Sequence, residues 1–322
     1  MQKGVSLMLK IAAVLLALSV PAAAQDYPTK PIRLIIPFPP GGSNDVVGRM
    51  IALQLGERLG RQVIVDNRGG AGGIIGTEAA SKAAPDGYTL LIISIAHAVS
   101  PWLYKLQYDP IKSFVPVSIL ASGPNVLVVH PSLGVHSVTE LIALAKEKPG
   151  QLNYASAGIG SFQHLGGELF KLMAGVNLLH VPFKGGGPAM VDVVGGHTKV
   201  MFSSLVQTTP HIRSGKLRAL GTGGSARNPV LPDVPTIAEA GVPGYEAVNW
   251  WGIVAPAGTP AAIVDKLHTE ITAVQNSDEV KKYFASEGAQ TVQMSSAEFA
   301  TFIDKEMKKW ERVVKEGGIK AE

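Results

Sequence analysis

Short apolar runs alternate with longer segments of helical periodicity along most of the chain. The run Ile32–Phe38 is apolar at nearly every position, which is typical of a buried strand. Apolar residues at helical spacing follow it, and Gly60 stands where a glycine cap ends a helix. These helical positions are Val47, Met50, Ile51, Leu55 and Leu59. The pattern predicts a strand that leads into an amphipathic helix.

The same order of elements recurs directly afterwards. We predict a strand at Gln62–Val65, a short helix at Thr77–Ala84 and a strand at Tyr88–Ser94. The glycine-rich segment Gly70–Gly76 lies before this helix, and we interpret it as the close-packed start of the helix. Repeated strand–helix units imply a mostly parallel, buried sheet with helices on both faces. The predicted fold class is therefore α/β.

Two long extended segments interrupt the alternation. Phe114–Val129 is broken by Gly123-Pro124, and Ala247–Val254 is a second long apolar run. We interpret both as strands that pass from one domain to the other, so that a ligand cleft lies between two lobes. The chain then divides into a signal peptide at 1–24, a discontinuous domain 1 at 25–123 and 251–322, and an inserted domain 2 at 124–250.

The remaining elements are short strands of a second sheet and helices near the end of the chain. The strands are predicted at Asn153–Ala155, Leu178–Pro182, Lys199–Phe202 and Leu217–Gly221, and the helices near 260–275, 278–287 and 297–315. Capping-box spacing marks three helix starts: Ser137 with Glu140, Thr236 with Glu239, and Ser295 with Glu298. Thr259-Pro260 places a capping hydroxyl before a proline at the first helical position.

The first residues predict export. Lys3 and Lys10 precede the apolar run Ile11–Val20, and the small residues Ala22–Ala24 follow it, as in a cleaved secretory signal. The run is shorter than the roughly 20 residues of a membrane-spanning helix, so we expect a soluble mature protein. Removing residues 1–24 reduces the formal net charge from +4 to +2. A charge this small and evenly spread argues against a nucleic-acid partner.

Most catalytic and cofactor signatures are missing from the sequence. The chain has no cysteine, which excludes disulfides, thiolate catalysis and cysteine-held metals. It has no Gly-x-Ser-x-Gly elbow and no P-loop lysine. Gly70–Gly76 resembles a dinucleotide fingerprint, but its last glycine comes one position late. The eight histidines form no metal-ligand pair at close spacing. We therefore expect a binding role with no cofactor and no metal.

Two glycine-rich turns are the strongest functional candidates. Pro37–Asp45 and Ala155–Ser161 each follow an apolar strand and open into a helical pattern. The first N–H groups of a helix have no internal partner and carry partial positive charge, so glycine there exposes donors to an anion. Two such turns suggest a carboxylate held between two lobes. The alternative is that both are ordinary turns of an α/β fold, which need glycine anyway.

Each candidate residue has a functional and a structural interpretation. In the first turn, Phe38 ends the strand, Pro40 stiffens the loop, Gly41 and Gly42 expose the backbone, and Ser43 caps the helix or donates to a ligand. The second turn offers Ser156, Ala157, Gly158 and Ser161. Lys184 before a glycine run, His97 after a strand and Ser203 at another strand end complete the candidate set. Lys184 is alternatively a solvated turn residue, and His97 a satisfied buried histidine.

All these positions follow the carboxyl ends of predicted strands, where open α/β sheets bind ligands. Asp45 lies in the first helical turn, where a negative side chain complements the helix dipole. It therefore need not touch the ligand, and its charge would repel an anion.

Several segments together resemble the substrate-binding proteins of tripartite tricarboxylate transporters, the Bug family. The resemblance covers essentially the whole mature chain. It rests on Tyr27–Arg33 leading into Pro37–Asp45, on Val65–Arg68, Ala84–Leu90, Leu152–Gly158, Val181–Gly185 and Leu231–Thr236. It implies a two-lobed periplasmic binding protein of the type II, Venus-flytrap kind. It also implies that the two glycine turns grip a ligand carboxylate, partly through ordered water.

Carried over residue by residue, the resemblance assigns Phe38, Gly41, Gly42 and Ser43 to the first grip. The second grip is formed by Ser156, Ala157, Gly158 and Ser161, while His97, Lys184 and Ser203 face the rest of the ligand. One departure concerns Ser203-Ser204, where many members have Asp-Asn. The missing acid argues against a ligand whose far end is cationic, such as an amino acid.

The function predicted on these grounds is capture of a small organic anion for delivery to a membrane permease, by a monomeric periplasmic protein that catalyses no reaction. Two alternatives stay open. The chain is alternatively a ligand-sensing subunit for a membrane signalling kinase, or a secreted hydrolase or lyase on the same fold.

Overall fold

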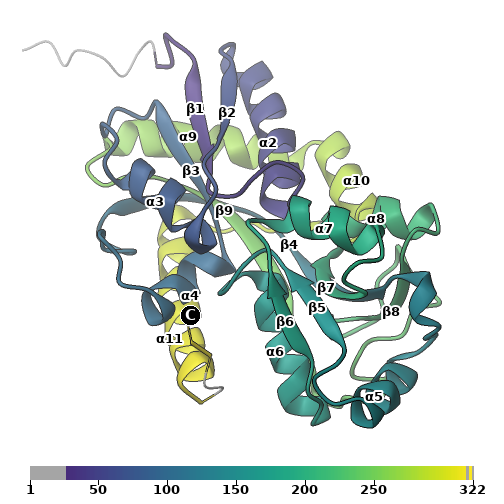
Figure 1. Ribbon diagram of the computed structural model, residues 1–322. Coiled ribbons are helices and arrows are strands. Elements are labelled where there is room, and N and C mark those ends of the chain that lie inside the picture. Colours follow the sequence, from purple (N-terminus) through teal and green to yellow (C-terminus); the bar gives the residue numbers. More distant parts are fainter. Residues whose placement is uncertain (1–26, 317–318, 321–322) are drawn as a thin grey trace, which may run out of the picture.

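The computed structural model describes residues 27–316 and 319–320. The predicted signal peptide therefore lies outside the described residues. The molecule is elongated, with two lobes side by side and the strands β4 and β9 between them (Figure 1). The first lobe carries β1 (Ile32–Ile36), β2 (Val63–Asn67), β3 (Thr89–Ser94), β10 (Gln290–Thr291), α2 (Ser43–Leu59), α3 (Ile74–Ser81), α4 (Ile95–Leu103), α9 (Ala261–Asn276), α10 (Asp278–Ser286) and α11 (Ser296–Glu316).

The second lobe is built around the inserted strands. It carries β5 (Asn153–Ser156), β6 (Leu179–Pro182), β7 (Val200–Ser204), β8 (Arg218–Thr222), α5 (Val138–Glu147), α6 (Phe162–Ala174), α7 (Gly186–Val194) and α8 (Leu205–Arg213). The connecting strands are β4 (Phe114–Val129) and β9 (Val248–Pro256), and two short 3-10 turns lie at Ala71–Gly73 and Pro131–Leu133. The elements thus follow the predicted order, with ends shifted by a few residues.

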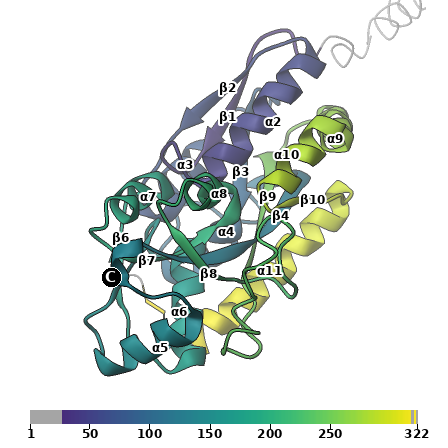
Figure 2. The ribbon, with the colours of Figure 1, turned by 90° about the vertical axis from the view of Figure 1, so that its right-hand side faces the viewer.

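Strand β4 belongs to both lobes. Its first part, Phe114–Pro124, pairs antiparallel with β9, and Asn125–Val129 pairs antiparallel with β7. The strands follow the order β2-β1-β3-β9-β4-β7-β5-β6, and β8 and β10 both pair with β4 off this path. The interpretation of both long segments as strands shared at the junction fits this pairing, and Figure 2 shows them between the lobes from the side.

The expectation of mostly parallel sheets is wrong. Strands β2, β1 and β3 are parallel, as are β7, β5 and β6. Every pairing of β4, and the pairing of β3 with β9, is antiparallel. The α/β class holds, but the sheets are mixed because the strands at the junction do not follow a strand–helix–strand crossover.

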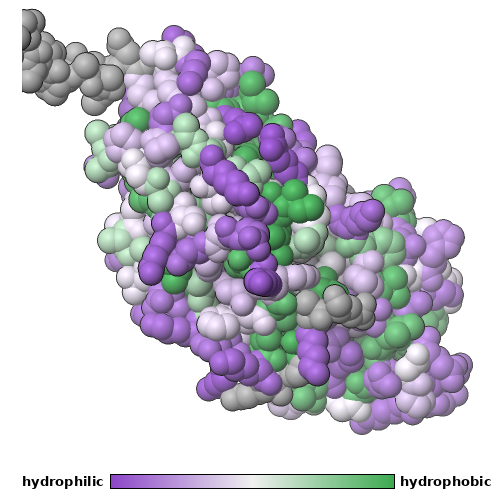
Figure 3. All heavy atoms as spheres, turned by 60° about the vertical axis from the view of Figure 1, so that its left-hand side comes forward, coloured by the Kyte–Doolittle hydropathy of each residue, from purple (hydrophilic) through white to green (hydrophobic). Residues whose placement is uncertain are grey.

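Each sheet is covered by helices on both faces. In the first lobe, α2 and α9 bury residues such as Ile51 and Leu267 on one face, while α4 and α11 bury Val99 and Phe299 on the other. The second lobe has equivalent cores under α5 and α6 and under α7 and α8. Polar and apolar residues are interspersed over the face seen in Figure 3. Within the described residues, no helix combines the length and hydropathy that a membrane span requires.

Some of the predicted helix caps are present in the structure and others are not. Gly60 caps α2 in a left-handed conformation, as expected. Ser295 and Glu298 form the reciprocal capping box at α11. Glu140 accepts from the N–H of His136 instead of that of Ser137, although the Ser137 hydroxyl accepts from the N–H of Glu140.

Two expected helix starts are wrong. Thr236 and Glu239 make both capping hydrogen bonds, but the segment forms only a turn, since the chain bends away after Ala240. Pro260 is itself the N-cap of α9, and the Thr259 hydroxyl donates to the carbonyl of Pro256. The helix therefore begins one residue later than the proline rule placed it.

The segment Gly70–Gly76 is a close-packed helix start, as interpreted. A Cβ added to Gly76 would lie 2.6 Å from the Arg68 carbonyl oxygen and 2.7 Å from the Cα of Pro37. The glycine is needed because α3 begins against the strand-end loop that carries Phe38.

Candidate functional site: a neutral cleft between helix starts

A small cavity lies between the two lobes. It is lined from the first lobe by Phe38, Gly42, Ser43, Asn44, Ser94 and Ala96, from the second by Ala157, Ser161, Phe162, Gln163 and Gly186, and from β9 by Asn249. These residues lie at the carboxyl ends of strands and the starts of the helices that follow, which is the usual ligand position in open α/β sheets. None of the lining side chains is ionisable.

The α2 side of the cavity is built by the first glycine turn. Gly41 adopts a positive φ of 82°, which glycine tolerates best, and turns the chain into the helix. Gly42 is the N-cap without a side-chain cap, and its carbonyl accepts from the N–H groups of Asp45 and Val46. Among the described residues, the N–H groups of Ser43 and Asn44 find no acceptor. The first turn therefore offers two free donors at a positive helix end.

Asp45 holds this turn from behind. Its buried carboxylate accepts from the Gly41 N–H at 2.9 Å, from Arg49 Nε at 2.9 Å and from Asn67 Nδ2 at 2.8 Å. The residue does not line the cavity. The negative charge is thus neutralised on the far side of the loop, and the Gly41 N–H is already engaged.

The second glycine turn stands on a polar network. The Ser156 hydroxyl accepts from the Gly158 N–H at 3.0 Å and lies 2.6 Å from His180 Nε2. His164 Nδ1 accepts from the Gly160 N–H at 3.2 Å. Burial lowers the pKa of His164 to about 4 and that of His180 to about 3. Both imidazoles are therefore neutral near pH 7, and Ser161 caps α6 above them through the N–H of His164.

Two further helices begin at the cavity. Helix α4 starts after Ser94, and α7 starts at Gly186 with Gly185 as its N-cap. Together with α2 and α6, four helix N-termini from both lobes meet at one cavity. Their unpaired N–H groups and dipoles make its potential positive without a cationic side chain.

Phe38 borders two adjoining cavities as well. The outer one is lined among others by Tyr104, Gly158, Phe183 and the exposed Lys184. The inner one includes His97, whose Nε2 lies 2.9 Å from the Pro110 carbonyl oxygen. Burial lowers the pKa of His97 to about 4. The cleft therefore continues past Phe38 in two directions. Its outer end carries the Lys184 ammonium group, and its inner end carries the neutral imidazole of His97.

The two lobes touch across the cleft. The Tyr104 hydroxyl donates to the Ile159 carbonyl at 3.1 Å. A Cβ added to Gly187 would lie 2.2 Å from the Pro40 carbonyl oxygen, and one added to Gly185 would lie 2.5 Å from Cδ of Pro39. The glycines allow the backbones of the facing turns to meet directly, so this is a closed arrangement.

The structure brings most of the predicted residues to the cleft, at different depths. Phe38, Gly42, Ser43, Ala157 and Ser161 line the central cavity. Gly158 and Lys184 line the outer cavity and His97 the inner one. The other four line none of the three cavities. Pro40 and Gly41 form the lobe contact, Ser156 supports its turn, and Ser203 is buried in β7 paired with Val126.

Sequence reasoning did not name several lining residues. Ser94 and Ala96 directly follow a predicted strand, so the carboxyl-end rule could have found them. Phe162 and Gln163 stand in the first turn of a helix whose start was recognised, whereas Gly186 belongs to the glycine run after Lys184 that was itself a candidate. Asn44 lies beside Ser43. Asn249 lies within β9, and no local pattern marks a strand residue as a cavity residue.

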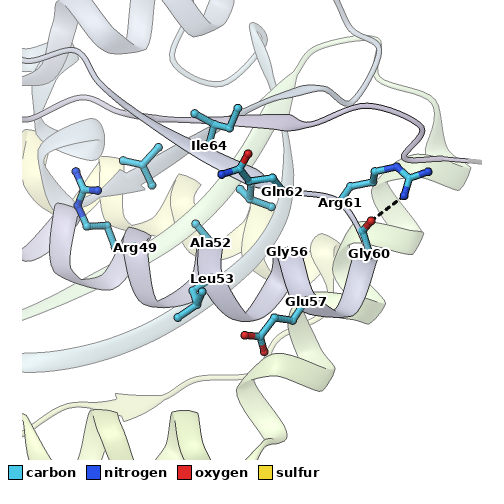
Figure 4. Close-up of a pocket in the computed structure, with 11 residues that line it drawn as sticks. Arg49, Ala52, Leu53, Gly56, Glu57, Gly60, Arg61, Gln62 and Ile64 are labelled. Carbon is cyan, nitrogen blue, oxygen red and sulfur yellow. Dashed lines mark hydrogen bonds between the residues drawn. The ribbon is translucent and has the colours of Figure 1, made fainter.

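Another cavity lies outside the cleft. An open groove runs along α2 and the edge strand β2, lined by residues that include Arg49, Leu53, Glu57, Arg61 and Ile64 (Figure 4). Arg61 donates there to the Gly60 carbonyl at 2.8 Å. Only one lobe forms this open groove, so lobe closure cannot enclose a ligand in it. Within residues 27–316 and 319–320, no cluster of three potential metal ligands occurs.

Fold and cleft together define a two-lobed α/β binding protein. Residues 47–319 match the model of the tripartite tricarboxylate transporter family receptor, and the chain belongs to this family. BugT of Bordetella pertussis is 41% identical over 306 residues, which cover 94% of this chain and 94% of BugT. The resemblance to the Bug family is thereby confirmed.

Two solved structures share this fold over nearly their whole length. R. palustris Rpa4515, solved with adipate, is 37% identical with a TM-score of 0.89, covering 92% of this chain and 99% of that chain. The periplasmic binding protein BugD is 33% identical with a TM-score of 0.89, covering 92% of this chain and 100% of that chain. The two-lobed fold expected from the sequence is confirmed.

Proposed function

We propose that this protein captures a small organic carboxylate in the interlobe cleft and delivers it to a tripartite tricarboxylate-type membrane permease. The observation that carries the proposal is the meeting of four helix N-termini, from both lobes, at a cavity without ionisable side chains. A carboxylate is the simplest ligand that accepts several N–H donors at once. The adipate bound to Rpa4515 is such a ligand.

The energetics favour retention of an anion without a paired cation. Hydrogen bonds to a charged group contribute about 1.5–3 kcal/mol each, so a few donors suffice. Closure of the lobes removes water and strengthens these bonds further. Lys184 at the outer cavity adds a positive charge along the entry route.

The proposed contacts follow the placement of the residues. The N–H groups of Ser43 and Asn44 on α2 and of Phe162 and Gln163 on α6 hold the carboxylate. Ala157, Gly158 and Ser161 shape the second grip, with Phe38 packed against the ligand. His97 and Lys184 face its remainder on opposite sides of Phe38.

We further propose periplasmic location, in line with BugD, after cleavage of residues 1–24, and action as a monomer that releases its ligand chemically unchanged. The domain boundaries proposed for this action are 25–123 with 251–322 and 124–250. The lobes would then move apart about β4 near Gly123 and β9 near Asn249.

A thermal-shift and calorimetric screen tests the function. Di- and tricarboxylates and aromatic acids are compared with their neutral amides, and the recovered ligand is analysed. We expect stabilisation by at least one acid, none by its amide, and recovery of the acid unchanged. Equal binding of acid and amide would contradict the anion site, and turnover of the acid would contradict a binding role.

A further inference from the structure

The interlobe cleft carries hydrogen-bond acceptors that a carboxylate cannot satisfy. Asn44 Oδ1 and Asn249 Oδ1 are buried and accept no hydrogen bond from any described residue, and both residues line the central cavity. Asn44 is 8% exposed and Asn249 1%. A carboxylate brings only acceptors, so it pairs with the helix N–H groups and leaves these two oxygens unpaired.

His97 supplies a third acceptor next to them. Its Nε2 faces the Pro110 carbonyl oxygen at 2.9 Å, and a carbonyl only accepts, so Nε2 carries the proton. Nδ1 of the neutral ring is then an acceptor, and it has no partner among the described residues. His97 lines the inner cavity, which shares Phe38, Ser94 and Ala96 with the central one. The acceptors therefore lie in one connected part of the cleft.

The charge of the site limits what kind of donor fits. No aspartate or glutamate lines the central, inner or outer cavity. An ammonium group would enter a region of positive helix ends without a counter-charge. A hydroxyl supplies a donor without charge.

We infer that the ligand is a hydroxylated carboxylate, whose carboxylate meets the helix N-termini and whose hydroxyl donates to the acceptor set of Asn44, Asn249 and His97. The inference rests on the proposed function and narrows its ligand class. A site with buried acceptors discriminates against an analogue that lacks the donor, because those acceptors then stay unpaired.

Matched acids that differ in one group test this directly. Calorimetry compares succinate, malate and aspartate, and separately propionate, lactate and alanine, on the full mature chain. In each set the three acids carry hydrogen, hydroxyl or ammonium at the same carbon. We expect the hydroxylated acid to bind at least about tenfold more tightly than the unsubstituted one in a set that binds, and the amino acid to bind no better than the unsubstituted one.

Leucine variants of Asn44 and Asn249 test whether these residues cause the preference for the hydroxylated acid. Asn249→Leu and, independently, Asn44→Leu should reduce the ratio of the two dissociation constants toward one. Thr222→Val is the matched control, since Thr222 also carries a buried, unpaired oxygen but lines none of the three cavities, and its ratio should stay at the wild-type value.

Each outcome separates the inference from the function on which it rests. Equal binding of the hydroxylated and unsubstituted acids, or tightest binding of the amino acid, would overturn the inference and leave carboxylate capture intact. A wild-type preference that persists in both leucine variants would overturn the assigned residues. Absence of binding in both sets, together with a failed acid screen, would overturn the proposed function and the inference with it.

Discussion

Asp45 is an acidic residue next to the proposed anion site, and its hydrogen bonds explain why it is tolerated there. Its carboxylate lies behind the first glycine turn and accepts hydrogen bonds from Gly41, Arg49 and Asn67. Arg49 also donates to Asn67 Oδ1, so the four groups form one network. The charge that would repel a ligand instead fixes the loop that exposes the helix donors.

Replacing Asp45 by asparagine should therefore loosen the turn. The amide cannot accept all three hydrogen bonds, so the free energy of unfolding should fall by about 1–3 kcal/mol, with weaker acid binding. Urea unfolding and calorimetry measure the two effects. Asp304→Asn is the control, because Asp304 pairs with Lys308 on the exposed face of α11. Equal stability of both variants would contradict the structural role of Asp45.

Two buried histidines, His97 and His164, and the half-buried His180 predict the pH dependence of stability. Burial lowers the pKa of His97 and of His164 to about 4 and that of His180 to about 3, below the ordinary value of 6.5. Between pH 6.5 and about 4 the unfolded chain binds protons that the native state does not. The free energy of unfolding should therefore be highest above pH 6.5. It should fall as the pH is lowered, by up to about 1.4 kcal/mol per pH unit for each histidine.

Urea unfolding from pH 7.5 to 4.5 measures this slope. The variant His164→Gln should reduce the slope, because a glutamine does not titrate. Loss of His164 Nδ1 should also weaken acid binding, since the Gly160 N–H then loses its acceptor. A stability that is constant or rises toward pH 4.5 would contradict the account.

At the scale of elements, the sequence predicted strands and helices well wherever strand–helix units repeat. The run Phe114–Val129 was predicted with its observed ends, because its apolar length exceeds that of an ordinary strand. The direction of the pairing around it was not predictable. Pairing depends on which strand lies beside β4 in space, and β9 comes from a part of the chain far away.

The same contrast holds for the site. The glycine turns were recognisable because each needs an unusual backbone and opens a helix, as at Gly41 and Gly158. Asn249 was not, since its role depends on the cleft that β9 crosses. Residues next to one another in the sequence are enough to predict a helix start. The buried acceptors of the cleft can be identified only from the folded arrangement of both lobes.

Gly187 offers a test of closure at the level of one helix. A Cβ there would collide with the Pro40 carbonyl of the other lobe, while alanine suits a position in the first turn of α7. Gly187→Ala should leave each lobe folded, hold the lobes apart and weaken acid binding about tenfold or more. Gly195→Ala, at the other end of α7, is the control and should bind like the wild type. Unchanged affinity in Gly187→Ala would show that closure is not required.

At the scale of the whole molecule, apolar packing and hydrogen bonds both join the lobes in the closed arrangement. Phe162 and Leu165 of α6 lie in one core of the first lobe, and Val206 of α8 lies in the other. Specific hydrogen bonds also cross between the lobes. One of them is the hydrogen bond from Tyr104 to the Ile159 carbonyl. Two further hydrogen bonds join the lobes: Arg213 of α8 donates to the Ser286 carbonyl, and Asn228 donates to the Gly288 carbonyl.

Tyr104→Phe should shift the lobes toward the open form. Removing one hydrogen bond of about 0.5–1.5 kcal/mol should weaken acid binding roughly two- to tenfold and enlarge the radius of gyration in solution without ligand. Small-angle scattering with and without a bound acid measures the change. A variant as compact and as tight-binding as the wild type would contradict a role for this contact.

The central claim is that main-chain donors at helix starts from both lobes hold one carboxylate. A crystal structure of the protein with an acid from the screen tests it most directly. We expect carboxylate oxygens within hydrogen-bond distance of N–H groups at the starts of both α2 and α6. A carboxylate bound instead to Lys184 alone, or in the groove between α2 and β2, would contradict it.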